Sequence, residues 1–250
     1  MSAAPLRVAS DAESIDTARL EAELDARGCA TLPALIAAAE CRALARLYDA
    51  DEHFRSRVVM ARHGFGRGEY RYFAYPLPEG VCNLRTRLYP LLVPLANRWQ
   101  ERLGVEARFP STHVEFVARC HAAGQTRPTP LLLRYGPDDF NCLHQDLYGE
   151  HVFPLQVAIL LSQPGDVANR GDFTGGEFVL TEQRPRMQSR VEVVSLRQGD
   201  AVVFAVHHRP VRALTRKDGR GDYRVNLRHG VSRVRSGSRH TLGIIFHDAS

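Results

Sequence analysis

The first hundred residues carry the spacing of apolar side chains that is typical of amphipathic helices. The predicted helices are 11–27, 33–50 and 83–103. The first ends at Gly28, and an apolar run at 29–32 predicts a short strand after it. We expect the third helix to be interrupted near Pro90 and Pro94, because proline lacks the backbone N–H that a helix needs. Residues 1–10 have no such pattern and predict a loose tail.

After Pro110 the chain changes to short runs of β-branched and apolar residues separated by turns. The predicted strands are Val114–Ala118, Leu131–Tyr135, Val157–Leu161, Glu177–Leu180, Val191–Leu196, Ala201–Val206, Tyr223–Leu227 and Thr241–Phe246. The predicted turns are Gly136-Pro137, Gly175-Gly176, Gly199-Asp200, Asp218-Gly219 and Ser236-Gly237. This predicts a mainly β fold with flanking helices, built on a double-stranded β-helix (jelly-roll, cupin-like) core. We expect one compact unit, in which 1–110 is a helical elaboration and possible substrate lid, and 111–250 is the core.

Composition is that of an ordinary globular domain, with 250 residues, 44% of them hydrophobic and 24% charged. No apolar run approaches the roughly 20 residues that span a bilayer. The start of the chain lacks the basic-then-apolar pattern of a secretory signal. We therefore expect a cytoplasmic protein without membrane contact, and no obligate protein partner is evident.

The cysteines and the net charge exclude few classes of ligand or binding partner. Five scattered cysteines without a C-x-x-C argue against a disulfide framework and a thiolate zinc site. The net charge is +5 and almost all of the positive charge is arginine, which suits contact with phosphate or carboxylate. A genome that favours arginine codons would give the same excess, so basicity permits a nucleic-acid partner without indicating one.

Metal-binding residues are indicated by His144-Gln145-Asp146, because residues two apart on a strand point to the same face. His229, at the end of another β-type run, would complete two histidines and one carboxylate. This is the ligand set of non-haem Fe(II) oxygenases, and it leaves metal positions open for a co-substrate and O2. Alone, the His-x-Asp pair could be a simple hydrogen-bonded pair, and by composition His207 and His208 are rival third ligands.

Arg239 favours His229 over those rivals, because it follows ten residues later across the Ser236-Gly237 turn. A hairpin there would bring Arg239 onto the strand beside His229. A permanently charged guanidinium in a dry barrel suits the distal carboxylate of 2-oxoglutarate. The alternative is an ordinary surface arginine.

A family resemblance combines these features. LLLRYGPDDFNCLHQD, FTGGEFVL, QGDAVVF and HGVSRVRSGSRHTLGIIF resemble the prolyl-hydroxylase-like branch of the Fe(II)- and 2-oxoglutarate-dependent oxygenases. The resemblance implies Fe(II), with 2-oxoglutarate and O2 as co-substrates, and implies that Tyr135 helps to bind 2-oxoglutarate. The tyrosine that other members supply after the His-x-Asp strand is not obvious in VAILLS. Gln156 or a hydroxyl such as Thr241 is the substitute that we expect.

More narrowly, MARHGFGRGEYRYF, HQDLYGEHVFPLQ, GGEFVLTEQRPRMQSR and TLGIIFHDA resemble a bacterial family whose members are described as oxygenases acting on damaged nucleic acid. This likeness runs from about residue 50 onward. It implies oxidative demethylation of alkylated DNA or RNA in repair, with a single-stranded or flipped base as substrate. The alternatives are hydroxylation of a protein side chain or small molecule, and a non-catalytic jelly-roll binding module.

Substrate residues are expected in segment 54–75, where arginines and aromatic residues alternate. Such a mixture can hold phosphates and stack unpaired bases. The candidates are Arg57, Arg67, Tyr70 and Tyr72, in a glycine-containing lid, together with Arg184 in a loop at the barrel mouth. The alternative is a β-hairpin whose aromatic residues are core and whose arginines are solvated, with Arg184 in a simple charged loop.

Overall fold

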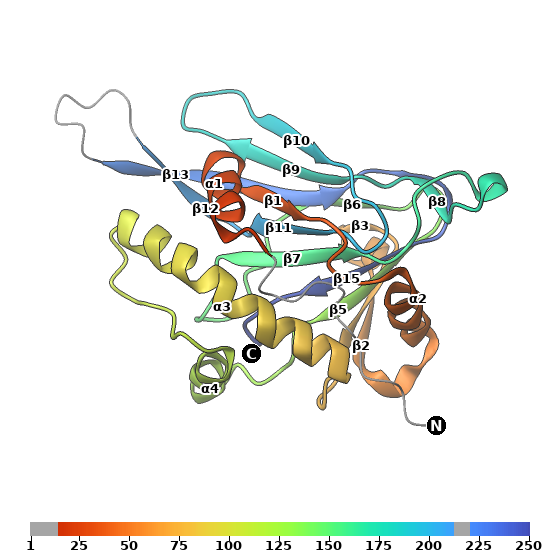
Figure 1. Cartoon of the computed structure of the whole chain (residues 1–250), viewed down its shortest axis with the longest axis horizontal. Helices are drawn as coiled ribbons and strands as arrows, with labels where there is room; N and C mark the ends of the chain where they lie inside the picture. Colours follow the sequence, from red (N-terminus) through yellow and green to blue (C-terminus); the bar gives the residue numbers. More distant parts are fainter. Residues whose placement is uncertain (1–14, 213–220) are drawn as a thin grey trace.

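The computed structural model describes residues 15–212 and 221–250 (Figure 1). The predicted tail at 1–10, the start of the first predicted helix and the Asp218-Gly219 turn lie outside these residues. None of the described helices is long and apolar enough to cross a membrane.

Two antiparallel sheets form the body of the fold, and their strands are ordered as in a jelly roll. The seven-stranded sheet runs β1 (Cys29–Leu32), β11 (Ala201–Ala205), β7 (Leu155–Leu160), β15 (Arg239–Ile244), β5 (Leu131–Tyr135), β4 (Glu69–Phe73) and β2 (Phe54–Val59). The six-stranded sheet runs β10 (Arg190–Val194), β9 (Phe178–Gln183), β13 (Asp222–Val231), β6 (Phe140–His144) and β3 (Gly66–Arg67), with β12 (His208–Arg212) also paired to β13. A small third sheet joins β14 (Val234–Gly237) to β8 (Phe173–Gly175).

The predicted fold class is confirmed, and every predicted strand except one overlaps an observed strand. The exception is Val114–Ala118, which lies in the helix α4 (His113–Ala122). The Thr112 hydroxyl accepts from the Glu115 backbone N–H while the Glu115 carboxylate accepts from that of Thr112. This capping box starts a helix at a position where the valines alone favour a strand.

The helix α3 (Glu79–Arg102) runs unbroken through Pro90 and Pro94, so the predicted interruption is wrong. An interior proline costs a helix about 3 kcal/mol. Burial of apolar residues on one face of α3 offsets that cost, and these include Leu88, Leu92 and Trp99. Figure 1 shows α3 and α4 on the side of the molecule away from β9 and β10.

Two shorter helices lie on either side of β1 in the sequence. The helix α1 (Thr17–Arg27) is capped by Asp16 and ends, as predicted, at Gly28, which has a φ of 78°. The helix α2 (Ala38–Arg46) is shorter than the predicted 33–50, and a 3-10 turn at Leu47–Asp49 follows it. Further 3-10 turns lie at Asp51–His53, Met60–Arg62 and Val167–Asn169.

Segment 54–75 belongs to both large sheets. Its strands β2 and β4 form one edge of the seven-stranded sheet, whereas β3 pairs with β6 in the other sheet. Only Gly68 separates β3 from β4. The division at residue 110 stays a prediction, but strands from both sides of it pair in the same sheets.

Candidate active site

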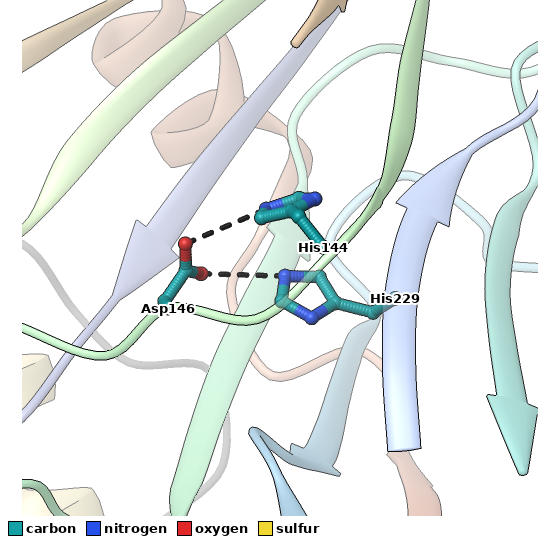
Figure 2. Close-up of side chains that lie close together, drawn as sticks. All are labelled: His144, Asp146 and His229. Carbon is teal, nitrogen blue, oxygen red and sulfur yellow. Dashed lines mark ion pairs between the residues drawn. The ribbon is translucent and has the colours of Figure 1, made fainter. Parts of the chain in front are cut away.

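Three side chains converge between the two sheets. His144 lies at the end of β6, His229 lies beside it on β13, and Asp146 follows two residues beyond the end of β6. Figure 2 shows the Asp146 carboxylate facing both imidazoles. Its Oδ1 lies 3.4 Å from His144 Nε2, and its Oδ2 lies 3.3 Å from His229 Nε2. Within the described residues, this is the one group of at least three metal-ligand side chains whose donor atoms lie within 4.8 Å of one another.

The surroundings orient these donors toward a shared point. His144 Nδ1 contacts the carbonyl oxygen of Cys142 at 2.8 Å, which leaves its Nε2 facing Asp146. Burial opposes ionisation of Asp146, but the two histidines hold the pKa of its carboxyl well below the usual range. Burial lowers the pKa of His229, so this imidazole is a neutral donor at pH 7. A carboxylate and two imidazoles fit the donor set of a divalent iron site.

Arg239 reaches the same cavity from the opposite sheet. The predicted hairpin is wrong, because β14 pairs with β8 and β15 pairs with β5 and β7 instead of β13. Arg239 therefore faces His229 across the cavity rather than lying on a neighbouring strand. Its backbone partner on β5 is Tyr135, and its Nη1 donates to the Thr241 hydroxyl at 2.5 Å.

The four predicted co-substrate residues all line this cavity, which has a volume of about 270 Å³. Within the part of the chain that the structure describes, three buried donor atoms among them have no hydrogen-bond partner: Arg239 Nε, the Tyr135 hydroxyl and Gln156 Nε2. Burial lowers the pKa of Arg239 to about 10, so it stays cationic at pH 7. Buried unpartnered donors beside a buried cation fit a carboxylate ligand, because each would otherwise remain without its hydrogen bond. The arrangement therefore fits the distal carboxylate of 2-oxoglutarate.

Aromatic residues of segment 54–75 form another wall of the cavity. Tyr70 and Tyr72 on β4 line it, with their ring centroids 5.4 Å apart at an interplanar angle of 84°. Phe65 also lines it and is 46% exposed, so an aromatic face there is open to solvent. These rings can contact a planar substrate.

The other three predicted substrate residues do not line the cavity. Arg57 is paired with Glu69 at 2.5 Å, and Arg67 lies 3.7 Å from Asp139. Arg184 donates to Glu182 at 2.7 Å. The rival ligands His207 and His208 do not line the cavity either, and their rings contact each other with centroids 3.3 Å apart at an interplanar angle of 38°.

Three further residues that were not predicted from the sequence also line the cavity. Tyr148 donates to Asp146 Oδ1 at 2.9 Å, and Tyr72 contacts the Tyr148 hydroxyl at 3.1 Å. Asn141 and Gln145 also line the cavity. The signal for Tyr148 was its place two residues after Asp146 in HQDLYGE.

The fold resembles that of solved oxygenase structures. The chain is 18% identical to a Burkholderia pseudomallei oxidoreductase of the 2OG-Fe(II) oxygenase family, with a TM-score of 0.52, covering 95% of this chain and 94% of that one. It is 13% identical to a Trichoplax adhaerens prolyl hydroxylase in complex with a hypoxia inducible factor peptide, with a TM-score of 0.54, covering 92% and 87%. The fold is thus that of oxygenases that use Fe(II), 2-oxoglutarate and O2, as predicted.

Sequence similarity identifies a narrower group. Two uncharacterized proteins from strains of Mycobacterium tuberculosis are each 51% identical over 178 residues, which cover 71% of this chain and 72% of theirs. A family model described as "Oxygenase, catalysing oxidative methylation of damaged DNA" matches residues 68–249. That match spans the metal-ligand candidates, Arg239 and most of both sheets. The chain therefore belongs to this family, Oxygenase-NA, and is an oxygenase.

Proposed function

We propose that this oxygenase removes alkyl groups, methyl in the simplest case, from the bases of damaged DNA or RNA. The observation that carries the proposal is the aromatic wall of Phe65, Tyr70 and Tyr72 in the same cavity as the His144–Asp146–His229 group. A base turned out of its stack offers a flat face to such a wall. The family description, which names damaged DNA, points to the same class of substrate.

In this proposal His144, Asp146 and His229 hold the iron, and Arg239 and Thr241 receive the distal carboxylate of 2-oxoglutarate, with Tyr135 and Gln156 beside them. Bound iron, with 2-oxoglutarate and O2, supplies the oxidant that hydroxylates a C–H bond. The buried side chains around it exclude competing water, and the aromatic wall holds the base.

Hydroxylation explains why we propose loss of a methyl group rather than its addition. One oxygen atom of O2 enters the N–CH3 group to give N–CH2OH, while 2-oxoglutarate takes the other and becomes succinate and CO2. The N–CH2OH product then releases formaldehyde and leaves an N–H on the base. No step in this sequence needs a methyl donor.

Methylated single-stranded oligonucleotides incubated with the protein, Fe(II) and 2-oxoglutarate test the proposal. We expect formaldehyde and an oligonucleotide that has lost the mass of one CH2 unit, because hydrogen replaces the methyl group, while His229→Ala yields neither. Release of succinate with a peptide or metabolite that gains one oxygen, and none with any oligonucleotide, would favour a hydroxylase instead. A protein that bound no Fe(II) and consumed no 2-oxoglutarate would be a non-catalytic binding module.

A further inference from the structure

Arg55, on the edge strand β2, is exposed and is held beside the aromatic wall by two contacts. Its Nε donates to the carbonyl oxygen of Pro128 at 2.9 Å. Its guanidinium lies over the ring of Tyr72, 4.6 Å from the ring centroid. A bulge in the pairing of β2 with β4 lies at this point, between Phe54 and Ser56. One nitrogen and one face of the guanidinium are therefore fixed, and the two terminal nitrogens remain.

Those terminal nitrogens have no partner among the hydrogen bonds and ion pairs of the described residues. Asp248 is a nearby carboxylate, but its oxygens are already occupied. Asp248 Oδ1 accepts from Arg85 at 2.7 Å, and Oδ2 contacts the Tyr75 hydroxyl at 2.7 Å and His121 at 2.8 Å. The carboxylate of Asp248, which acts electrostatically on Arg55, is thus engaged by other side chains.

A second arginine adds to this charge. Arg127 immediately precedes Pro128, whose carbonyl holds Arg55, and its own side chain is exposed. Across the described chain, no ion pair involves the Arg127 guanidinium. Burial lowers the pKa of Arg55, and the charge of Arg127 lowers it further. These two neighbouring cations have no ion-pair partner among the described residues, so they form a place where an anion is stabilised.

We propose that Arg55 and Arg127 form a phosphate subsite for the nucleic-acid backbone next to the base that occupies the cavity. The inference rests on the proposed function and names how the substrate's backbone would be held. A planar guanidinium presents two parallel N–H groups to a phosphate. Because Arg55 is already fixed by Pro128 and Tyr72, it loses little side-chain freedom on binding.

The test is binding without turnover, by fluorescence anisotropy of a labelled single-stranded oligonucleotide with one methylated base, with 2-oxoglutarate omitted. Affinity is measured between about 50 and 200 mM KCl, the range over which phosphate contacts weaken strongly. We expect Arg55→Gln to weaken binding roughly tenfold and to reduce the slope of log affinity against log salt by about 0.7, the value for one single-strand phosphate. Arg127→Gln should act in the same direction.

Two controls separate charge from structure. Arg55→Lys keeps the charge and should keep the salt slope. Arg57→Gln removes the same charge from the same strand, but Arg57 is paired with Glu69, so its slope should equal that of the wild type. Thermal melting of each variant checks that it is folded.

A wild-type slope in both Arg55→Gln and Arg127→Gln would overturn the subsite. So would an oligonucleotide that does not bind while an acidic peptide does. The proposed function is tested by a separate measurement, the release of formaldehyde. Reduced slopes in the two variants, together with no formaldehyde from any methylated oligonucleotide, would reject demethylation and leave the phosphate subsite standing.

Discussion

The two faces of the β2–β4 strand pair differ sharply although they share one stretch of chain. One face carries Tyr70 and Tyr72 into the cavity. The other carries Arg57 against Glu69 and Arg71 against Asp51, each pair at 2.5 Å. Alternate residues of a strand point to opposite faces, so within β4 Arg71 is separated from Tyr70 and Tyr72. The separation does not extend to the whole segment, because Arg55 lies over the Tyr72 ring and Arg71 lies over the Phe54 ring.

Neither of the two interpretations of segment 54–75 describes both faces. The aromatic residues at 70 and 72 lie where a substrate can reach them, whereas Arg57 and Arg71 are engaged with carboxylates. We call these the cavity face and the ion-paired face. The following four predictions test whether they have separate roles.

Replacement of His229 by alanine should have the largest effect, because it removes a proposed iron ligand at the inner end of the cavity. We expect affinity for Fe(II) to fall by more than about 100-fold, beyond the loss from residues that only support a ligand. The readout is the rise in melting temperature on adding Fe(II) without oxygen, which should vanish. An undiminished rise in this variant would show that the metal binds elsewhere.

Tyr148→Phe should have the next largest effect, because it connects the cavity face to the metal group. The Tyr148 hydroxyl donates to Asp146 and contacts Tyr72. Loss of a hydrogen bond that orients a ligand typically costs 10- to 100-fold in metal affinity, and we expect about tenfold here. Titration with Co(II), followed by its visible absorption, measures it. Wild-type affinity and an unchanged spectrum would mean that Tyr148 does not position the carboxylate.

Two replacements of Tyr70 distinguish base stacking from hydrogen bonding on the cavity face. Tyr70→Ala should weaken binding of a methylated oligonucleotide about tenfold, because stacking on an aromatic ring contributes about 1–3 kcal/mol per base. Tyr70→Phe keeps the ring and should bind as the wild type does. Equal losses in both variants would assign the contact to the hydroxyl.

Replacement of Glu69 should have the smallest effect of the four, and it should change only the stability of the fold. The Arg57 hydrogen bond lowers the pKa of Glu69 from its ordinary value of 4.5, against the effect of burial. A lowered carboxyl pKa contributes stability that is present above 4.5 and is lost as pH falls through the lowered value.

Glu69→Gln should therefore melt below the wild type at pH 7 by the equivalent of at most about 1 kcal/mol, and the gap should close in acid. Oligonucleotide binding should not change. A binding defect in Glu69→Gln would mean that the ion-paired face also serves the substrate.

Much of the fold was visible in the sequence because strand periodicity and turn residues are local properties. The helix at 113–122 was missed because its capping box outweighs the strand preference of its valines. The continuity of α3 through Pro90 and Pro94 depends on packing, which no local pattern reports.

The candidate site followed the same division between local and long-range information. The two-residue spacing of His144 and Asp146 predicted that their side chains would converge, and they do, although Asp146 lies beyond the end of the strand. Arg239 lines the same cavity as His229, as predicted, but the predicted hairpin between their strands is wrong. A turn sequence does not show which sheet the next strand joins. Ion pairing of Arg57 and Arg184 depends on distant or buried partners, which the sequence could not identify.

The passage of segment 54–75 between the two sheets limits how substrate preference can change within this family. Gly66 approaches the backbone of β6, where an added Cβ would lie 2.3 Å from the Phe140 carbonyl oxygen, and Gly68 approaches the Tyr135 ring. β6 in turn ends at His144. An insertion, deletion or wholesale exchange of this segment would shift the metal group along with the substrate wall. New specificity in a relative or an engineered variant should therefore arise by single replacements at cavity-facing positions, with the length of the segment preserved.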